Sequence, residues 1–150
     1  MTHEDFEVEL LRKWVESVLA TLGEGFDRET QARILKPCGK ACAVHHGDLS
    51  KAQELGGAFD DVDGLLAELN RRLDWCGEWR RAGDAIVSIC ERCGCPLVRE
   101  GLVKLVPAFC ECSRGFVEAL FQRAFGQPVF VALKRAIGRG DPVCEFVVHR

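Results

Sequence analysis

The spacing of apolar residues changes after Trp79, and this change constrains the fold more than any other feature of the sequence. Before it, apolar residues recur with a helical period; in the first segment they fall at every fourth position from Phe6 to Leu22, which is typical of an amphipathic helix. After it, short apolar runs such as "AIVSICERC" and "CPLVREGLVKLV" favour strands. Helices are therefore expected first and a sheet second.

Start and stop signals divide the first half into helices. The first is predicted from His3 to Leu22, and Asp27 is expected to cap the second. Pro37 is expected to interrupt that second helix, because proline lacks the backbone N–H that continues it, and "CGKACAVHHG" is expected to begin a new helical turn or to form a kinked continuation.

Two further signals follow in the helical half. Gly56 and Gly57 predict a loop, and Asp60 or Asp61 is expected to cap another helix that runs to Leu73.

The second half predicts an antiparallel sheet that contains one helix. The segment Pro107 to Cys112 is expected to be extended, and Ser113 is expected to cap a helix from Arg114 to Phe125. The last stretch, "QPVFVALKRAIGRGDPVCEFVVHR", predicts two strands joined by the turn "GRGD". Residues 1–150 are thus expected to form a single α+β domain, with N-terminal helices packed on an antiparallel sheet and one embedded helix.

Composition limits the surroundings and partners of the chain. Hydrophobic residues make up 47% and charged residues 29%, the balance of a globular protein. No apolar run is long enough to cross a bilayer, and the opening "MTHEDFEVELLRKW" is too charged for a signal peptide. The net charge is −3 without a basic cluster, which argues against a nucleic-acid partner. We expect a cytoplasmic protein with no membrane contact.

Nine cysteines in 150 residues are the main chemical signal. The number is odd, and a chain of this size does not need cross-links to fold, so metal or thiol chemistry is favoured over disulfides. Isolated cysteines also serve as small buried apolar residues. We interpret Cys76 and Cys144 in that way.

The paired cysteines predict a metal site. Cys110 and Cys112 would share one face of an extended segment, and Cys38 and Cys42 would lie one turn apart on a helix, with His45 or His46 a further turn along. Such soft ligands suit zinc or an iron–sulfur cluster. The set expected to converge is Cys38, Cys42, Cys95, Cys110 and Cys112, with Cys90 and Cys93 in reserve.

A cysteine nucleophile is the alternative. Reactive thiolates need a helix N-terminus, a cation or an imidazole to lower the pKa. Cys112 precedes Ser113 and Arg114 at the expected helix start, and Cys38 has Lys40 nearby. Either cysteine is therefore a candidate catalytic residue.

Several of these segments resemble known families. "FCECSRGFVEALFQRAFGQPVFVALKRAIGRGDPVCEFVV" is similar to the C-terminal half of the 4-vinyl-reductase-type small-molecule sensor domains. The combination of "CGKAC", "CGCPLV", "FCECS" and "RGDPVCEF" resembles the L-2-amino-thiazoline-4-carboxylic acid hydrolase-like family. The resemblance covers the last 60 or so residues well and the helical half only through "CGKAC".

The resemblance implies a fold like that of the sensor domains and the TRAPP trafficking subunits, in which helices and a twisted antiparallel sheet enclose an apolar ligand pocket. It also implies a homodimer. The zinc ligands of the metal-binding sensors do not carry over, because Leu133 and Ala136 occupy two of their positions and only Cys144 matches. The hydrolase name implies opening of a thiazoline ring at its C=N carbon.

Three functions follow as hypotheses. The first is a cytoplasmic sensor-type domain whose thiols hold a metal or contact a small molecule in an apolar pocket. The second is a hydrolase of a small cyclic C=N substrate through Cys112 or Cys38. The third is a structural interaction module with buried cysteines.

Overall fold

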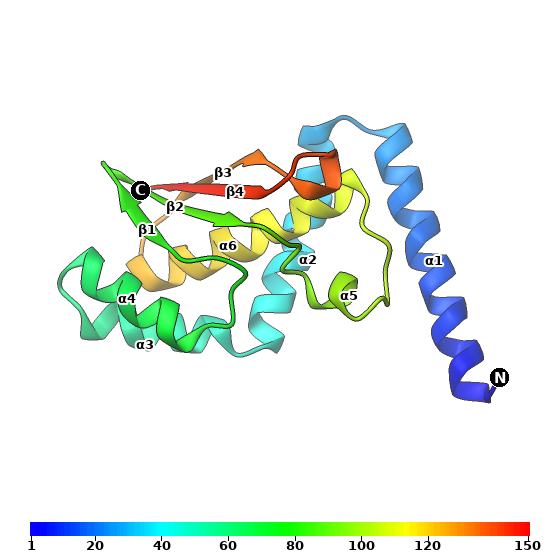
Figure 1. Cartoon of the computed structure of the whole chain (residues 1–150), viewed down its shortest axis with the longest axis horizontal. Coiled ribbons are helices and arrows are strands. Elements are labelled where there is room, and N and C mark those ends of the chain that lie inside the picture. The colour runs from blue at the N-terminus through cyan, green and yellow to red at the C-terminus, as the bar shows by residue number, and fades with distance from the viewer.

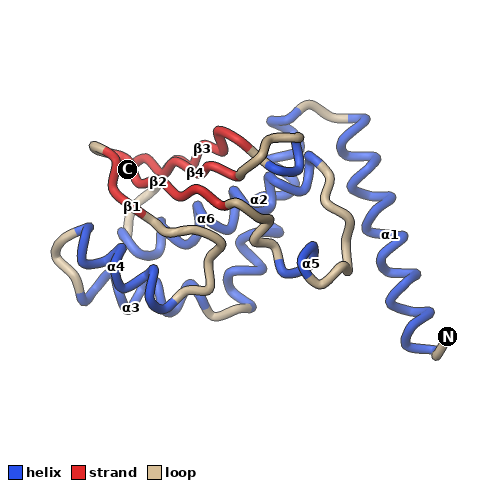
Figure 2. The backbone as a smooth tube through the Cα atoms, in the orientation of Figure 1, coloured by secondary structure: helices blue, strands red, loops and turns tan.

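The computed structural model describes all 150 residues as six α-helices and one antiparallel sheet (Figures 1 and 2). The helices are α1 (His3–Gly25), α2 (Arg28–His45), α3 (Asp48–Ala58), α4 (Val62–Arg72), α5 (Pro96–Arg99) and α6 (Cys110–Phe125). The strands are β1 (Arg80–Ala82), β2 (Ala85–Cys90), β3 (Phe130–Arg135) and β4 (Cys144–His149). Two short 3-10 turns are η1 (Pro107–Phe109) and η2 (Ile137–Arg139).

The sheet has the strand order β1-β2-β4-β3, and every neighbouring pair is antiparallel. Helix α6 runs along one face of the sheet, and α2 and α3 pack against the side of α6 that faces away from the strands (Figure 1). The expected α+β class is confirmed.

The predicted helix signals are mostly confirmed. The Asp27 side chain accepts a 2.8 Å hydrogen bond from the N–H of Thr30, and Asp61 accepts one of 2.6 Å from Gly64. Helix α6 ends at Gly126, whose φ of 66° lies in the left-handed region that glycine adopts without strain. These local rules held because each uses only neighbouring backbone atoms.

The loop predicted at Gly56 and Gly57 is wrong, and at Pro37 the helix continues instead of being interrupted. Helix α2 continues through Pro37, and α3 continues through Gly56 and Gly57. Packing outweighs local preference in both places. At Gly56 an added Cβ would lie 1.9 Å from the main-chain oxygen of Ala124 in α6, so this glycine serves close helix contact rather than a turn.

The strands expected between residues 96 and 112 are also wrong. Pro96 begins the short helix α5, and Pro107 begins η1, which leads directly into α6 at Cys110. Both prolines occupy a first helical position, where the missing N–H costs nothing. Ser113 therefore lies inside α6 instead of capping it, and strand β1 was not predicted.

The main core lies between the sheet and α6. Trp79, Phe121 and Phe146 are almost fully buried there, and their rings make edge-to-face or tilted contacts at centroid distances of 4.8 to 6.4 Å. A second buried cluster joins α1 and α2 to η1 through Leu19, Leu35 and Phe109, among others. The functional site described below lies beside the main core.

Helix α1 stands at one side of the molecule (Figure 1) and buries only Leu19 and Leu22. The apolar row of this helix is exposed: Phe6 by 56%, Leu10 by 60% and Trp14 by 65%. Trp14 therefore does not belong to the core within one copy of the chain. None of the helices has both the length and the apolar character of a membrane span.

Candidate functional site: a cavity lined by cysteines

A cavity of about 620 Å³ lies where the end of α2, the start of α3, the loop before α5, the first turns of α6 and the strands β3 and β4 meet. Its wall is mainly apolar and includes Trp75, Phe116, Leu133 and Phe146. Seven cysteines also line it: Cys42, Cys76, Cys93, Cys95, Cys110, Cys112 and Cys144. Sulfur atoms that are distant in the sequence are therefore gathered around one space.

Close contact between α2 and α6 brings the "CGKAC" segment to this cavity. A Cβ on Gly39 would lie 1.8 Å from the main-chain oxygen of Cys112, and a Cβ on Gly115 would lie 2.3 Å from that of Lys36. Only glycine permits backbones to approach so closely. Because Gly39 lies between Cys38 and Cys42, the contact places this pair directly against the turn that carries Cys112.

The two cysteines of "CEC" point in different directions. They were expected to share a face of an extended segment, but both lie in α6, where positions two apart are separated by about 200° around the axis. The Cys110 sulfur faces η2, where a Cβ on Gly138 would meet it at 2.6 Å. Cys112 faces α2.

Burial raises the pKa of the Cys112 thiol to about 12. The next causes are the neighbouring thiols of Cys42, Cys38 and Cys95, which would repel a Cys112 thiolate. Burial also raises the pKa of Cys95, although the N–H groups of Val98 and Leu97 favour its thiolate. Cys112 and the three thiols that affect its ionisation, Cys38, Cys42 and Cys95, are called here the α2–α6 thiol group.

Cys110 belongs to a different neighbourhood. Burial raises its pKa to about 11, and the Cys144 thiol adds to the rise, while the N–H of Gly138 and the charge of Arg139 oppose it. Burial raises the pKa of Cys144 as well, and the N–H of Ile137 favours its thiolate. Of the five sulfurs expected to converge, Cys38, Cys42 and Cys95 thus lie near enough to Cys112 to affect its ionisation, whereas Cys110 faces elsewhere in the same cavity.

Cys38 is the outermost member of the α2–α6 thiol group. It is exposed and does not line the cavity. Its sulfur lies 3.8 Å from the main-chain oxygen of Ile34, to which the thiol donates a hydrogen bond. Cys38 and Cys42 share a helix face because α2 is continuous, as expected from their spacing.

Two histidines that the sequence placed near this group do reach the cavity. His45 ends α2 and His46 follows it, and both rings line the wall, with centroids 5.9 Å apart. No three side chains of His, Cys, Asp or Glu converge in an arrangement ready to hold a metal ion.

Cys76 and Cys90 form a disulfide, with Cα atoms 5.2 Å apart. Cys76 was interpreted as an isolated buried residue and Cys90 as a reserve metal ligand, and both interpretations are wrong in this state. The pairing could not be read from sequence because the segment after α4 meets β2 only through the tertiary fold. The other seven cysteines are free.

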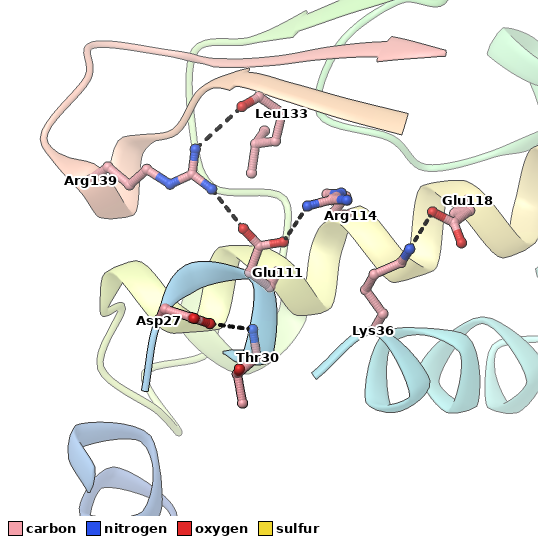
Figure 3. Close-up of polar contacts among 8 residues, drawn as sticks. All are labelled: Asp27, Thr30, Lys36, Glu111, Arg114, Glu118, Leu133 and Arg139. Carbon is pink, nitrogen blue, oxygen red and sulfur yellow. Dashed lines mark hydrogen bonds and ion pairs between the residues drawn. The ribbon is translucent and has the colours of Figure 1, made fainter. Parts of the chain in front are cut away.

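A buried carboxylate holds the start of α6, and the sequence analysis missed it. Glu111 is 1% exposed and pairs with Arg139 of η2 at 2.8 Å and with Arg114 at 3.0 Å (Figure 3). Arg139 also donates to the main-chain oxygen of Leu133 at 3.2 Å. Arg114 was proposed to stabilise a Cys112 thiolate, but its guanidinium pairs with Glu111 instead.

A second ion pair secures the other side of this helix contact. Lys36 of α2 lies 2.6 Å from Glu118 of α6, and the Asp27 cap fixes the first turn of α2 (Figure 3). Ion pairs on α6 thus face both η2 and α2, so the cysteine-bearing turn of α6 is held from two directions.

Fold and cavity together define an α+β domain with one mainly apolar cavity, whose wall carries free thiols. The chain belongs to a family of unknown function (DUF6144), which matches residues 2–149. No curated protein matches the chain. The similarity to the thiazoline hydrolase-like family remains a prediction from the sequence.

Proposed function

We propose that this protein is a sensor-type binding domain whose α2–α6 thiol group holds a soft metal centre, either a zinc ion or an iron–sulfur cluster. Four cysteines are the ligand number of both a structural zinc site and a cubane cluster. The observation that carries the proposal is the Gly39–Cys112 backbone contact, which sets the Cys38–Cys42 pair against Cys112.

The thiol chemistry supports a cation at this place. Four neighbouring thiols repel one another once ionised, and this repulsion contributes to the raised pKa of Cys112. A bound cation replaces the protons and removes that repulsion. Contact between α2 and α6 already brings Cys42 and Cys112 near each other, and metal binding would require Cys38 and Cys95 to move toward them.

We propose that the apolar part of the cavity, away from the α2–α6 thiol group, binds a small molecule. A volume of about 620 Å³ falls within the range of small-ligand pockets. Stacked rings of Trp75 and Phe116, with centroids 5.8 Å apart, form part of the wall, so a flat apolar ligand is the best match.

A cysteine hydrolase is less favoured. A nucleophilic thiol requires a lowered pKa, whereas burial raises that of Cys112 to about 12. Cys38 donates its thiol proton to a main-chain oxygen, and no imidazole is bonded to either sulfur among the hydrogen bonds of the site. We therefore expect no hydrolysis of the thiazoline substrate, which serves as a negative control when the binding proposal is tested.

We further propose that the exposed row of α1 is covered by a second copy of the chain. Phe6, Leu10 and Trp14 are spaced by four, and rows of that spacing interdigitate at about −50°. A two-fold axis at Leu10 would set Phe6 of one copy against Trp14 of the other, so the row complements itself. Helix α1 carries six acidic residues and only two lysines or arginines. Its negative charge disfavours binding of this helix to an anionic lipid surface.

A cytoplasmic location is part of the same proposal. Seven of nine cysteines are free, as a reducing compartment favours, and the one disulfide, Cys76–Cys90, would there be of the transient, redox-active kind.

Metal quantitation tests the main proposal. Protein purified without a histidine tag is assayed for zinc and iron and by visible absorption; zinc without colour indicates the ion, and iron with a broad visible band indicates the cluster. Cys42→Ser and Cys112→Ser are expected to lose most of the metal. Cys110→Ser is the matched control, since it lies two residues away and faces η2, and it should retain the metal. Metal-free wild type, or equal loss in all three variants, contradicts the proposal.

A further inference from the structure

The Cys76–Cys90 disulfide lies at the wall of the cavity, outside the α2–α6 thiol group. It joins the segment after α4 to the last residue of β2. Cys90 is fully buried, whereas Cys76 lines the cavity. One sulfur of the bond is thus accessible from the cavity and the other is not.

A free thiol stands next to the buried sulfur. In the β2–β4 ladder Cys144 is the residue directly opposite Cys90, so both side chains project from the same face with Cβ atoms about 4.5–5.5 Å apart. A disulfide requires Cα atoms about 4.4–6.8 Å apart, which neighbouring antiparallel strands satisfy. The Cβ atoms must approach to the roughly 3.5–4.5 Å of a disulfide, so bonding of Cys144 to Cys90 requires the two strands to draw together by up to about 1–2 Å at this pair.

Burial raises the pKa of Cys144, and one hydrogen bond opposes that rise. The N–H of Ile137 donates to the Cys144 sulfur at 3.4 Å, and a hydrogen bond of this kind stabilises a thiolate. Cys144 also lines the cavity, which leaves space for the sulfur to change position.

The Cys76 segment does not depend on the disulfide for its place. Asn70 and Trp79 exchange two hydrogen bonds of 2.8 and 2.9 Å, and the Trp75 indole N–H donates to Ser88 of β2 at 3.2 Å. Backbone contact adds to this, since a Cβ on Gly77 would lie 2.3 Å from the main-chain oxygen of Ile89. Breaking the Cys76–Cys90 bond therefore leaves the segment held by α4 and β2.

We propose that Cys76, Cys90 and Cys144 form a thiol–disulfide exchange centre. The Cys144 thiolate attacks the Cys90 sulfur, the Cys90–Cys144 bond forms, and the Cys76–Cys90 bond breaks. Cys76 takes the electron pair and leaves as a thiolate at the cavity wall. One disulfide replaces another, so no external oxidant or reductant takes part, and the reverse attack by Cys76 restores the first state.

The exchange changes what the cavity offers to a ligand. In the state seen here, Cys76 is bonded and Cys144 is free; after exchange, Cys76 is a free nucleophile beside Trp75. The reactive partners are small electrophiles and disulfides that fit the cavity, because a Cys76 thiolate attacks sulfur or an activated carbon. This inference does not rest on the proposed metal centre, which uses other cysteines.

Disulfide mapping tests the centre in full-length, metal-depleted protein prepared without reductant. Acid first stops thiol–disulfide exchange by protonating the thiolates. The free thiols are then alkylated, and the protein is digested and analysed by mass spectrometry. Wild type is expected to yield two linked peptides, Cys76–Cys90 with alkylated Cys144 and Cys90–Cys144 with alkylated Cys76. Detection of Cys76–Cys90 alone, or of neither linked peptide, overturns the proposal.

Native-state alkylation gives a second measurement. A small maleimide is expected to modify Cys76 in wild type, and Cys144→Ser should slow that modification at least about tenfold because the attacking sulfur is gone. Cys144→Ala should behave in the same way, while Cys110→Ser, which alters the same cavity outside the ladder, should keep the wild-type rate. Equal Cys76 modification in all variants would show that Cys144 plays no part.

Discussion

Gly39 of α2 lies in backbone contact with Cys112 of α6: a methyl group on this glycine would come within 1.8 Å of the Cys112 oxygen. The contact fixes the helix spacing and the position of the α2–α6 thiol group at once. Stability and metal binding should therefore respond together to any enlargement of Gly39.

Gly39→Ala is predicted to destabilise the fold by about 1–3 kcal/mol, because the helices must separate to admit the methyl group. Urea unfolding measures this loss. Gly57→Ala in α3 is the matched control, since nothing lies within 4 Å of a Cβ there, and it should be neutral or stabilising by up to ~1 kcal/mol. Equal effects of the two substitutions would show that the close contact does not exist.

Glu111→Ala is predicted to destabilise the protein by about 3–5 kcal/mol, since it leaves the Arg139 and Arg114 guanidiniums without their buried partner. Glu54→Ala serves as the control: Glu54 is 70% exposed and its ion pair with Arg72 is 4.0 Å long, so less than about 1 kcal/mol should be lost. Denaturant midpoints report both values. A loss for Glu111→Ala no larger than that of the control would contradict the described network.

The metal-free protein is predicted to lose stability as the pH rises above about 8.5, the pKa of an unfolded thiol. Burial holds the pKa of Cys112 near 12 and that of Cys110 near 11, so the folded chain keeps protons that the unfolded chain releases. Below a pH of about 8.5 the thiols are protonated in both the folded and the unfolded chain. They therefore add no pH dependence to the free energy of unfolding there.

Urea midpoints from roughly pH 8 to 10.5 measure this slope, and Cys112→Ala should reduce it. An identical slope in the variant would mean that Cys112 is not buried among the other thiols.

Leu10→Glu is predicted to convert a dimer to a monomer, because it places two carboxylates at the proposed two-fold axis. Sedimentation velocity measures the mass. Ala20→Glu is the control, an exposed position on α1 outside the Phe6–Leu10–Trp14 row, and it should leave the mass unchanged. A wild-type monomer at micromolar concentration would contradict the proposed dimer.

Local signals in the sequence predicted the parts of the fold that depend on neighbouring residues. The caps Asp27 and Asp61, the stop at Gly126 and the pairing of the last two strands agree with the structure, although residues 136–143 join these strands through η2 instead of a tight "GRGD" turn. Each involves groups only a few residues apart, so their geometry is encoded locally.

The errors share one cause, which is long-range packing. Pro37, Gly56 and Gly57 carry the ordinary signals of a break, yet α2 and α3 continue through them. The helices persist because they pack on α6, and Gly56 serves that contact instead of a turn. A single sequence does not reveal which glycine is needed because a distant stretch of backbone packs closely against it.

The sequence by itself determined the α+β class, the helix caps at Asp27 and Asp61, the end of α6 and the presence of nine cysteines. Only the tertiary structure decided which sulfurs meet: Cys38, Cys42, Cys95 and Cys112 across the α2–α6 contact, and Cys76 with Cys90 beside Cys144. The physical reason is that periodicity and capping depend on atoms within one or two turns, whereas a sulfur's neighbours depend on how closely two distant backbones approach.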